Sequence, residues 1–487
     1  MIVINRALAR LLLSVLRRSL NEQHARWQPP WLLCRADGEG LLLYAKVGMV
    51  GVAYRAPGRP PSEAMAFSTS VLDAISGRRG DEPLVFENVG PQKGRARWQD
   101  GNVPRVHEFA TLKPDKVQNC PALPAKWAPL PPTFLSAFDE AAQTASPEST
   151  KFATARVQLH GKTGQIVATD SKQALLQSGF RFPWEDVVQV PSLRAFGLRE
   201  LAQESTVRIA RTEKTVCVQA GSWTFFLDID TEGKPPPVHA IIPKPTAITC
   251  CAQIDPEDAV FLAQALPRLP GRKDDSAPVT LDLNRVVTVR SRAAESETVT
   301  EVELARSSIT GTPQRLAVNR VYLERALKLG LPEIQVVDPA RPVVFHDKQR
   351  LYVSITLPAD YVLSPGPNAL RICSATERDS AETEPESDLQ PSTSRRIPTM
   401  PARHNNHHVP QNHADNGSSQ NGADNRVGQP GGLNIMQLLV EVEQIRGVLQ
   451  DALGRVTHLH GALKQYRRHG KAMEDAMKSL RGLNFTG

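Results

Sequence analysis

The sequence VNRVYLERALKLGLPEIQVVDPARPVVFHDKQRLYVSITLP, from Val318 to Pro358, predicts one helix followed by three short strands. Apolar or small side chains recur along one helical face, at Leu323, Ala326, Leu327 and Gly330. Gly330 and Pro332 then end the helix, because glycine suits a helix C-terminus and proline cannot continue one. Strands are expected where β-branched and aromatic residues follow, at Glu333–Val337, Pro342–His346 and Leu351–Thr356.

The same helix-then-strands pattern occurs twice more in the chain. Pro191–Ile229 contains PSLRAFGLRELAQ followed by three strand-like runs, and Ser68–Phe109 repeats the pattern more loosely. Copies spaced roughly 120–130 residues apart are typical of tandem domains rather than of a solenoid.

A second helix begins each of the three copies. These helices are expected at Asn5–Leu20, Thr133–Ala145 and Asp255–Leu269, and strand patterns separate each of them from the helix that follows. We therefore predict an α+β chain of three tandem domains, each with two helices packed on antiparallel sheet. Their expected bounds are residues 1–112, 125–247 and 250–373.

The last part of the chain has a different composition. Residues 374–432 are rich in Ser, Thr, Pro, Asn, His and Gly, and such a segment cannot bury enough apolar surface to offset its ordering entropy. We predict a disordered linker there. From residue 433 to 483, apolar or small residues alternate at steps of four and three, which predicts a coiled-coil helix. A single amphipathic helix packed on the body is the alternative.

Composition limits the function classes. The formal net charge of +7 is compatible with a polyanionic partner, although many soluble proteins carry as much. The six cysteines lack metal-site spacing, and no apolar run reaches the length of a membrane span. We expect reduced thiols, no membrane and a cytoplasmic protein, with the nucleoid as its site of action if DNA is the partner.

The order and spacing of these elements resemble the bacterial sliding clamp, the beta subunit of DNA polymerase III. Gln165–Asp170 is similar to the family's strand ending in Ala-Thr-Asp, and Phe225–Asp230 leads to Ile-Ile-Pro at 241–243, where the family has Val-Ile-Pro. Asn319–Leu327 resembles the family's last inner helix, and Tyr352–Asp360 stands where the family ends in a Met-Pro-Met-Arg-like tail. The resemblance covers roughly residues 1–360.

The resemblance implies a pocket for a short peptide motif of polymerases and repair enzymes, between the second and third domains. Residues 171–174 read Ser-Lys-Gln-Ala where the family usually has Gly-His-Arg-Leu, and Asp360 is an acid where the family is basic. The expected pocket residues are Thr169, Ser171, Lys172, Gln173, Ala174, Pro243, Leu357, Pro358 and Ala359.

The resemblance also implies a dimeric ring around duplex DNA, whose interior needs only sequence-independent attraction to phosphates. Basic side chains on the expected helices fit that role. They are Arg6, Arg10, Arg17, Arg78, Arg194, Arg199, Arg268, Arg320, Arg325 and Lys328. The helix at Thr133–Ala145 departs from this pattern, because it is acidic.

No phosphate-binding loop, nucleophile elbow or metal-ligand cluster is present in the part expected to fold, so we predict no enzyme activity, cofactor or metal. Two hypotheses remain open. The first is a DNA-encircling clamp that tethers a polymerase or repair factor. The second is an interaction scaffold that kept the clamp fold, no longer binds DNA and acts through its coiled-coil tail.

Overall fold

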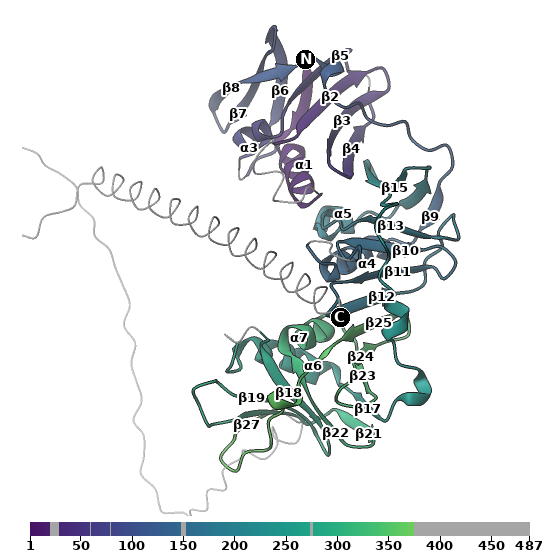
Figure 1. Cartoon of the computed structure of the whole chain (residues 1–487). Helices are drawn as coiled ribbons and strands as arrows, with labels where there is room; N and C mark the ends of the chain where they lie inside the picture. The colour runs from purple at the N-terminus through teal and green to yellow at the C-terminus, as the bar shows by residue number, and fades with distance from the viewer. Residues whose placement is uncertain (20–28, 59, 78, 148–151, 273–275, 375–487) are drawn as a thin grey trace, which may run out of the picture. The chain divides into compact units, whose positions relative to one another are not determined.

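The computed structural model describes residues 1–19, 29–58, 60–77, 79–147, 152–272 and 276–374 (Figure 1). The chain divides into two units, Met1–Asp388 and Leu389–Gly487, and all described residues lie in the first. Arg78, the predicted coiled coil and all of the predicted linker except Ser374 therefore lie outside the described residues.

Six α-helices are described in these ranges, and five of them match helices expected from the sequence. They are α1 (Arg6–Ser19), α3 (Ser70–Ser76), α4 (Thr133–Thr144), α5 (Arg199–Ala202), α6 (Pro256–Ala265) and α7 (Arg320–Lys328). Asp255 caps α6 by accepting a hydrogen bond of 2.9 Å from the backbone N–H of Glu257, and Asn319 caps α7 in the same way.

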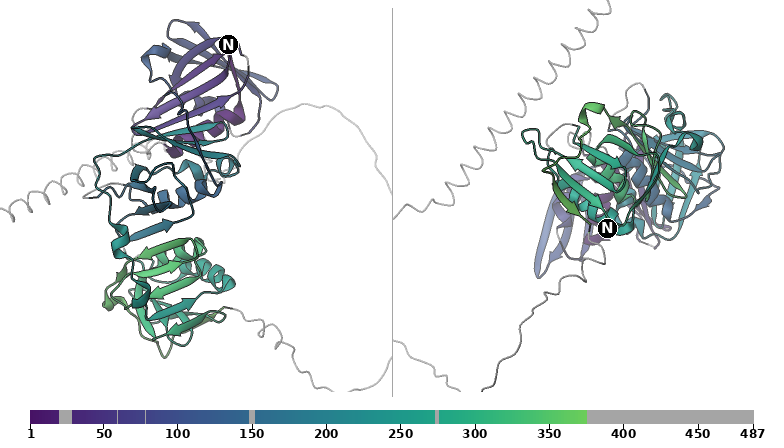
Figure 2. Two further views of the ribbon diagram at one scale, coloured as in Figure 1. Left: turned by 90° about the vertical axis from the view of Figure 1, so that its right-hand side faces the viewer. Right: turned by 90° about the horizontal axis from the view of Figure 1, so that it is seen from below.

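The strands form three sheets within the described residues (Figures 1 and 2). The largest has the order β1-β6-β7-β8-β5-β2-β3-β4-β16-β15-β14-β9. Its strands are β1 (Ile2–Asn5), β2 (Trp31–Asp37), β3 (Gly40–Val47), β4 (Val50–Ala56), β5 (Glu63–Ser68), β6 (Pro83–Gly90), β7 (Lys93–Asp100), β8 (Val103–Leu112), β9 (Ala128–Leu130), β14 (Val207–Arg211), β15 (Thr215–Ala220) and β16 (Trp223–Asp228).

The second sheet has the order β13-β10-β11-β12-β25-β24-β23-β17-β21, and the third has the order β26-β22-β18-β19-β20-β27. The strands of the second are β10 (Arg156–His160), β11 (Gln165–Thr169), β12 (Gln173–Gln177), β13 (Val187–Pro191), β17 (Cys250–Gln253), β21 (Ser308–Gly311), β23 (Glu333–Val336), β24 (Val343–His346) and β25 (Arg350–Ser354). Those of the third are β18 (Pro278–Leu283), β19 (Val287–Ser291), β20 (Thr300–Leu304), β22 (Gln314–Asn319), β26 (Thr356–Leu357) and β27 (Leu370–Cys373).

Two of these sheets cross the domain boundaries expected from the sequence. β4 pairs with β16, with Trp223 opposite Tyr54, and β12 pairs with β25, with Ala174 opposite Val353. Pairing is antiparallel throughout, except between β20 and β27. The predicted α+β class with antiparallel sheets is confirmed, while the division into three domains stays a prediction.

The helices pack apolar side chains against the sheets. Phe134 and Phe138 of α4 are fully buried in a core that also contains Leu12 and Val15 of α1. Leu323 and Ala326 of α7 lie in a second core formed with α6 and the third sheet. Each core removes apolar surface from water, which is the main stabilising contribution to the fold.

The helix predicted from Pro191 is the clearest correction. Residues 195–197 form one 3-10 turn and α5 has only four residues, because Leu198 between them is extended, with φ −69° and ψ 134°. Phe196 of that turn is fully buried and packs on Phe225 with a ring-centroid distance of 4.8 Å. This packing, rather than helix periodicity, determines the path of the segment.

Candidate functional site

A tight turn between β11 and β12 lies against β25. The carboxylate of Asp170 accepts hydrogen bonds of 2.8 Å from the backbone N–H groups of both Lys172 and Gln173. The backbone N–H of Ile355 donates to the carbonyl of Lys172 at 3.0 Å, and Tyr352 donates to the side chain of Gln173. The turn is therefore held both by its own aspartate and by the neighbouring strand.

Ser171 adopts an unusual backbone conformation in this turn. Its φ is +77°, in the left-handed region where residues with a Cβ are strained. The backbone N–H of Ser171 donates to the hydroxyl of Thr169 at 3.0 Å, which helps to hold this conformation.

A small apolar cavity opens beside the turn, with a volume of about 170 Å³. Val353 and Ile355 contribute from the β25 side, and a proline-rich loop and the following 3-10 turn close the opposite side. The complete lining is Phe152, Thr169, Ser171, Lys172, Gln173, Pro236, Pro237, Val238, Ile241, Pro342, Val353 and Ile355. Ligand sites of drug size occupy roughly 300–1,000 Å³, so this cavity is sized for one apolar side chain rather than a whole ligand.

A second cavity of about 410 Å³ lies farther along the same strand pair. Leu176 of β12 and Leu351 of β25 line it, opposite Ile242 and Pro243. Ala174, Leu176 and Val238 belong to one small apolar cluster, on which Leu351 and Ile242 also pack. The two cavities therefore lie on one face of the β12–β25 pair, on either side of the 3-10 turn Val238–Ile241.

The predicted pocket residues are divided between several places. Thr169, Ser171, Lys172 and Gln173 line the first cavity, Pro243 lines the second, and Ala174 is buried in the apolar cluster beneath. Leu357, Pro358 and Ala359 line neither cavity. The chain turns away after Ile355, and Leu357 pairs with Ala317 in the third sheet.

The lining residues that sequence analysis missed are Phe152, Val353 and Ile355 among others. Val353 and Ile355 lie two positions apart, so they point to the same face of an extended chain. That alternation was the available signal.

Five of the predicted DNA-facing side chains are exposed. Arg17, Arg194 and Lys328 have 60%, 58% and 65% exposed side chains and pair with Asp73, Asp139 and Glu324 respectively. Arg199 and Arg268 are exposed, and neither has an ion-pair partner within the described residues.

Four others contact the protein itself. Arg320 is 1% exposed, and its guanidinium donates to backbone carbonyls, including those of Leu269 at 2.6 Å and Pro278 at 3.3 Å. Arg6 is 5% exposed and pairs with Glu82 at 3.0 Å and with Asp100 at 3.2 Å. These two arginines stabilise the fold and do not present a charge to a ligand.

Arg10 and Arg325 are half-buried and also have structural partners. Arg10 donates to the carbonyl of Ser76 at 3.0 Å and to that of Gly80 at 2.5 Å. Arg325 of α7 donates to the carbonyl of Glu140 at 2.7 Å and to the hydroxyl of Thr144 at 2.8 Å, joining α7 to α4. Burial lowers the pKa of Arg325.

The described residues contain neither a metal site nor a membrane-spanning helix. In the part of the chain that the structure describes, no group of three or more His, Cys, Asp or Glu side chains could hold a metal ion. None of the described helices is both long and apolar enough to cross a membrane.

Solved structures with the same arrangement of elements come from several bacteria. The sliding clamp (DNA polymerase III subunit beta) of Pseudomonas aeruginosa has 18% sequence identity and a TM-score of 0.60, over 73% of this chain and 98% of that one. The DNA polymerase III beta chain of Streptococcus pneumoniae has 17% identity and the beta subunit of Thermotoga maritima has 14%, each with a TM-score of 0.60 over 73% of this chain and 99% of the other. No protein-family model and no curated protein sequence matches the chain. The described part of this chain has the fold of the bacterial DNA polymerase III beta sliding clamp, in a diverged sequence.

Proposed function

We propose that this chain acts as a non-catalytic sliding clamp: it encircles duplex DNA without sequence specificity and tethers a polymerase or repair factor. The observation that carries the proposal is the pair of cavities on the β12–β25 face, the smaller of them apolar, in a chain whose fold is that of sliding clamps. We place the partner's clamp-binding peptide in these cavities, with one apolar side chain in the smaller of them.

The DNA contact in this proposal is electrostatic. The proposed DNA-facing side chains are the exposed ones, namely Arg17, Arg194, Arg199, Arg268 and Lys328. Long basic side chains that contact phosphates bind any sequence. Their affinity falls as the salt concentration rises, because releasing the condensed counterions of the DNA then gains less free energy. Arg6, Arg10, Arg320 and Arg325 are left out, because their hydrogen bonds are to the protein.

The proposed assembly is a homodimeric ring, by analogy with the clamp fold, and the proposed location is the cytoplasm at the nucleoid. Closed symmetric dimers are the commonest form of soluble oligomer. Such a ring is retained on DNA by topology, so weak contacts are enough to keep it there.

The test is retention on closed circular DNA, before and after the circle is cut. We expect the protein, loaded onto a nicked circle, to stay through gel filtration and to be lost after linearisation. Reversing Arg17, Arg199, Arg268 and Lys328 to Glu should weaken retention at least tenfold. A matched control reverses Lys126, Lys162, Lys214 and Lys244, which are exposed outside the helices. Equal retention of both variants would contradict the proposed DNA-facing set.

The scaffold function is the second candidate, and one observation favours it. The turn at 171–174 carries Ser-Lys-Gln-Ala instead of the family's usual residues, so the first cavity has a different rim. In that case the protein ignores both circular and linear DNA, and partners bind through residues 433–483. Electron microscopy of the purified protein separates the two candidates: a closed ring wide enough for duplex DNA supports the clamp, and particles without a hole support the scaffold.

A further inference from the structure

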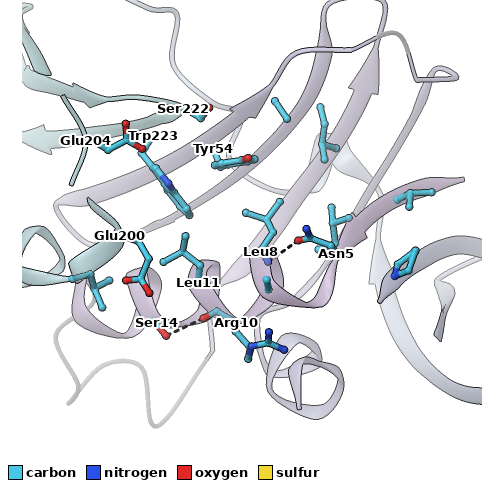
Figure 3. Close-up of a pocket in the computed structure, with 17 residues that line it drawn as sticks. Asn5, Leu8, Arg10, Leu11, Ser14, Tyr54, Glu200, Glu204, Ser222 and Trp223 are labelled. Atoms are coloured by element: carbon cyan, nitrogen blue, oxygen red, sulfur yellow. Dashed lines mark hydrogen bonds between the residues drawn. The ribbon is translucent and has the colours of Figure 1, made fainter. Parts of the chain in front are cut away.

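A larger groove lies between α1 and the strands β4 and β16, well away in sequence from the β12–β25 cavities. Its volume is about 810 Å³, within the range of whole-ligand sites. Leu8 and Leu11 of α1 form one side, and Tyr54, Trp223 and the segment around α5 form the other (Figure 3). The proposed clamp function uses none of these side chains.

The second side of the groove combines aromatic rings with carboxylates. Tyr54 and Trp223 lie opposite each other in the β4–β16 pair, with ring centroids 4.9 Å apart. Glu204 lies beside Trp223 and Ser222, and Glu200 of α5 lies nearer to Leu11 (Figure 3). Burial and the Glu204 carboxylate raise the pKa of Tyr54.

The charge in the groove is unbalanced. Among the described residues, neither Glu200 nor Glu204 has an ion-pair partner, and Glu200 is exposed. Arg10 also lines the groove and keeps its positive charge, with its guanidinium hydrogen-bonded to the carbonyls of Ser76 and Gly80, so the two carboxylates outnumber it. Two carboxylates beside aromatic rings attract a cation, through charge and through the ring faces. DNA phosphates, in contrast, are repelled.

The first side supplies apolar surface. Leu8 and Leu11 of α1 are half-buried and line the groove, so part of each side chain faces it. Val3 of β1 lines the groove with 47% of its surface exposed. β1 ends the sheet order of the described strands, with β6 as its one ladder partner there, and Met1 just before it contacts Glu63 of β5.

The geometry points to a second peptide-binding site in this groove, whose ligand is an extended peptide with an arginine or lysine next to an apolar side chain. The cationic group pairs with Glu200 and Glu204, and the apolar side chain packs on Leu8 and Leu11. This site acts independently of the β12–β25 cavities and of DNA binding, so it stands if the proposed function fails.

The experiment is selection of random displayed peptides on the immobilised full-length protein, followed by affinity measurement by fluorescence polarisation. We expect enrichment of peptides with a basic residue beside an apolar one. Their affinity should fall roughly tenfold or more in the double variant Glu200→Lys, Glu204→Lys, because a charge-assisted contact becomes a repulsion. Leu11→Asp should weaken the same peptides. Glu213→Lys, an exposed reversal in the turn between β14 and β15, is the matched control and should leave affinity unchanged.

Two results would overturn the site. One is selection without enrichment of basic-apolar peptides. The other is enriched peptides that bind the Glu200→Lys, Glu204→Lys variant as tightly as the wild type. Loss of their binding in Ile355→Asp, with affinity kept in the double variant, would assign those peptides to the β12–β25 cavity instead. Circular dichroism of each variant checks that the fold is intact.

Discussion

The hydroxyl of Tyr352 donates a hydrogen bond of 2.6 Å to Oε1 of Gln173. The bond joins the middle of β25 to the first residue of β12, directly beneath the turn that borders the first cavity. Burial raises the pKa of Tyr352, so the phenol stays protonated and remains a donor. The shape of the cavity therefore depends on a partly buried contact between residues 179 positions apart.

Replacing Tyr352 with Phe removes that donor and leaves the Gln173 carbonyl without it. We expect a loss of about 1–2 kcal/mol in the free energy of unfolding, the usual cost of a lost buried hydrogen bond. Urea denaturation measures it, with Tyr361→Phe at the surface as the control. A double-mutant cycle with Gln173→Met should give a coupling energy of about 1 kcal/mol, and a coupling of zero would contradict the contact.

Ser171→Gly should stabilise the protein. Glycine adopts the φ of +77° without the strain that a Cβ imposes, although it also increases the entropy of the unfolded chain. The net expectation is a gain of about 0.5–1 kcal/mol in the free energy of unfolding. Thermal denaturation provides the measurement, and Ser171→Ala, which keeps the Cβ, should show no such gain.

Substitution of Arg325 should affect stability, whereas substitution of Arg199 should affect DNA binding. Arg325→Ala removes donors to Glu140 and Thr144 and should cost about 1–3 kcal/mol of unfolding free energy. Arg199→Ala, at an exposed position, should leave stability within about 0.5 kcal/mol of the wild type while lowering the slope of DNA affinity against salt by about one. An unchanged salt slope in Arg199→Ala would remove it from the DNA-facing set.

Arg290 lies in a buried ion cluster on the third sheet. Its Nε contacts Glu301 at 2.7 Å, its Nη1 pairs with Asp282, and all three side chains are less than a tenth exposed. Arg290→Met leaves two buried carboxylates without this partner, so we expect a loss of about 3–5 kcal/mol in chemical denaturation. Arg371→Met, which removes the exposed partner of Glu301, should cost less than about 1 kcal/mol.

Protonation of His160 should lower the free energy of unfolding in mild acid. Burial, together with the charge of neighbouring His239, lowers the pKa of His160 from 6.5 to about 4. Between these values the unfolded chain binds a proton that the folded chain does not, so lowering the pH through this window favours unfolding. We expect His160 to account for about 1–2 kcal/mol of the stability lost between about pH 7 and about pH 4.5, after allowance for solvent screening.

The measurement for His160 is urea denaturation at both pH values. His160→Gln should reduce the pH-dependent loss by that amount. An identical loss in His160→Gln and the wild type would exclude this histidine as the acid-sensitive group.

The segment 318–358 could be predicted from sequence because local signals agree there. The predicted helix and strands match α7, β23, β24 and β25 within a few residues at each end. Asn319 caps the helix with a hydrogen bond of 2.8 Å to the N–H of Val321. Periodicity, capping and turn residues all act within one short stretch, so the local sequence is enough to predict its helix and strands.

The roles of the arginines could not be predicted in the same way. Arg320 and Lys328 lie on one helix, yet the first is buried and the second is exposed. The carbonyls that hold Arg320 come from residues 42–54 positions earlier, which only the folded chain brings together. Likewise, the first cavity uses Ile355 rather than Leu357, because β26 pairs with β22 and turns the chain away.

The pairing of β4 with β16 has a consequence for how the protein comes apart. Five residues of β16 lie opposite five of β4. This hydrogen-bonded ladder therefore joins a strand that precedes the segment between β8 and β9 to a strand that follows it. Melting β4 alone would remove one of the two neighbours of β16 and expose Trp223 to water. Heat should therefore disrupt these regions as a single cooperative event, and a protease that cuts between β8 and β9 should leave the two fragments attached until the ladder itself opens.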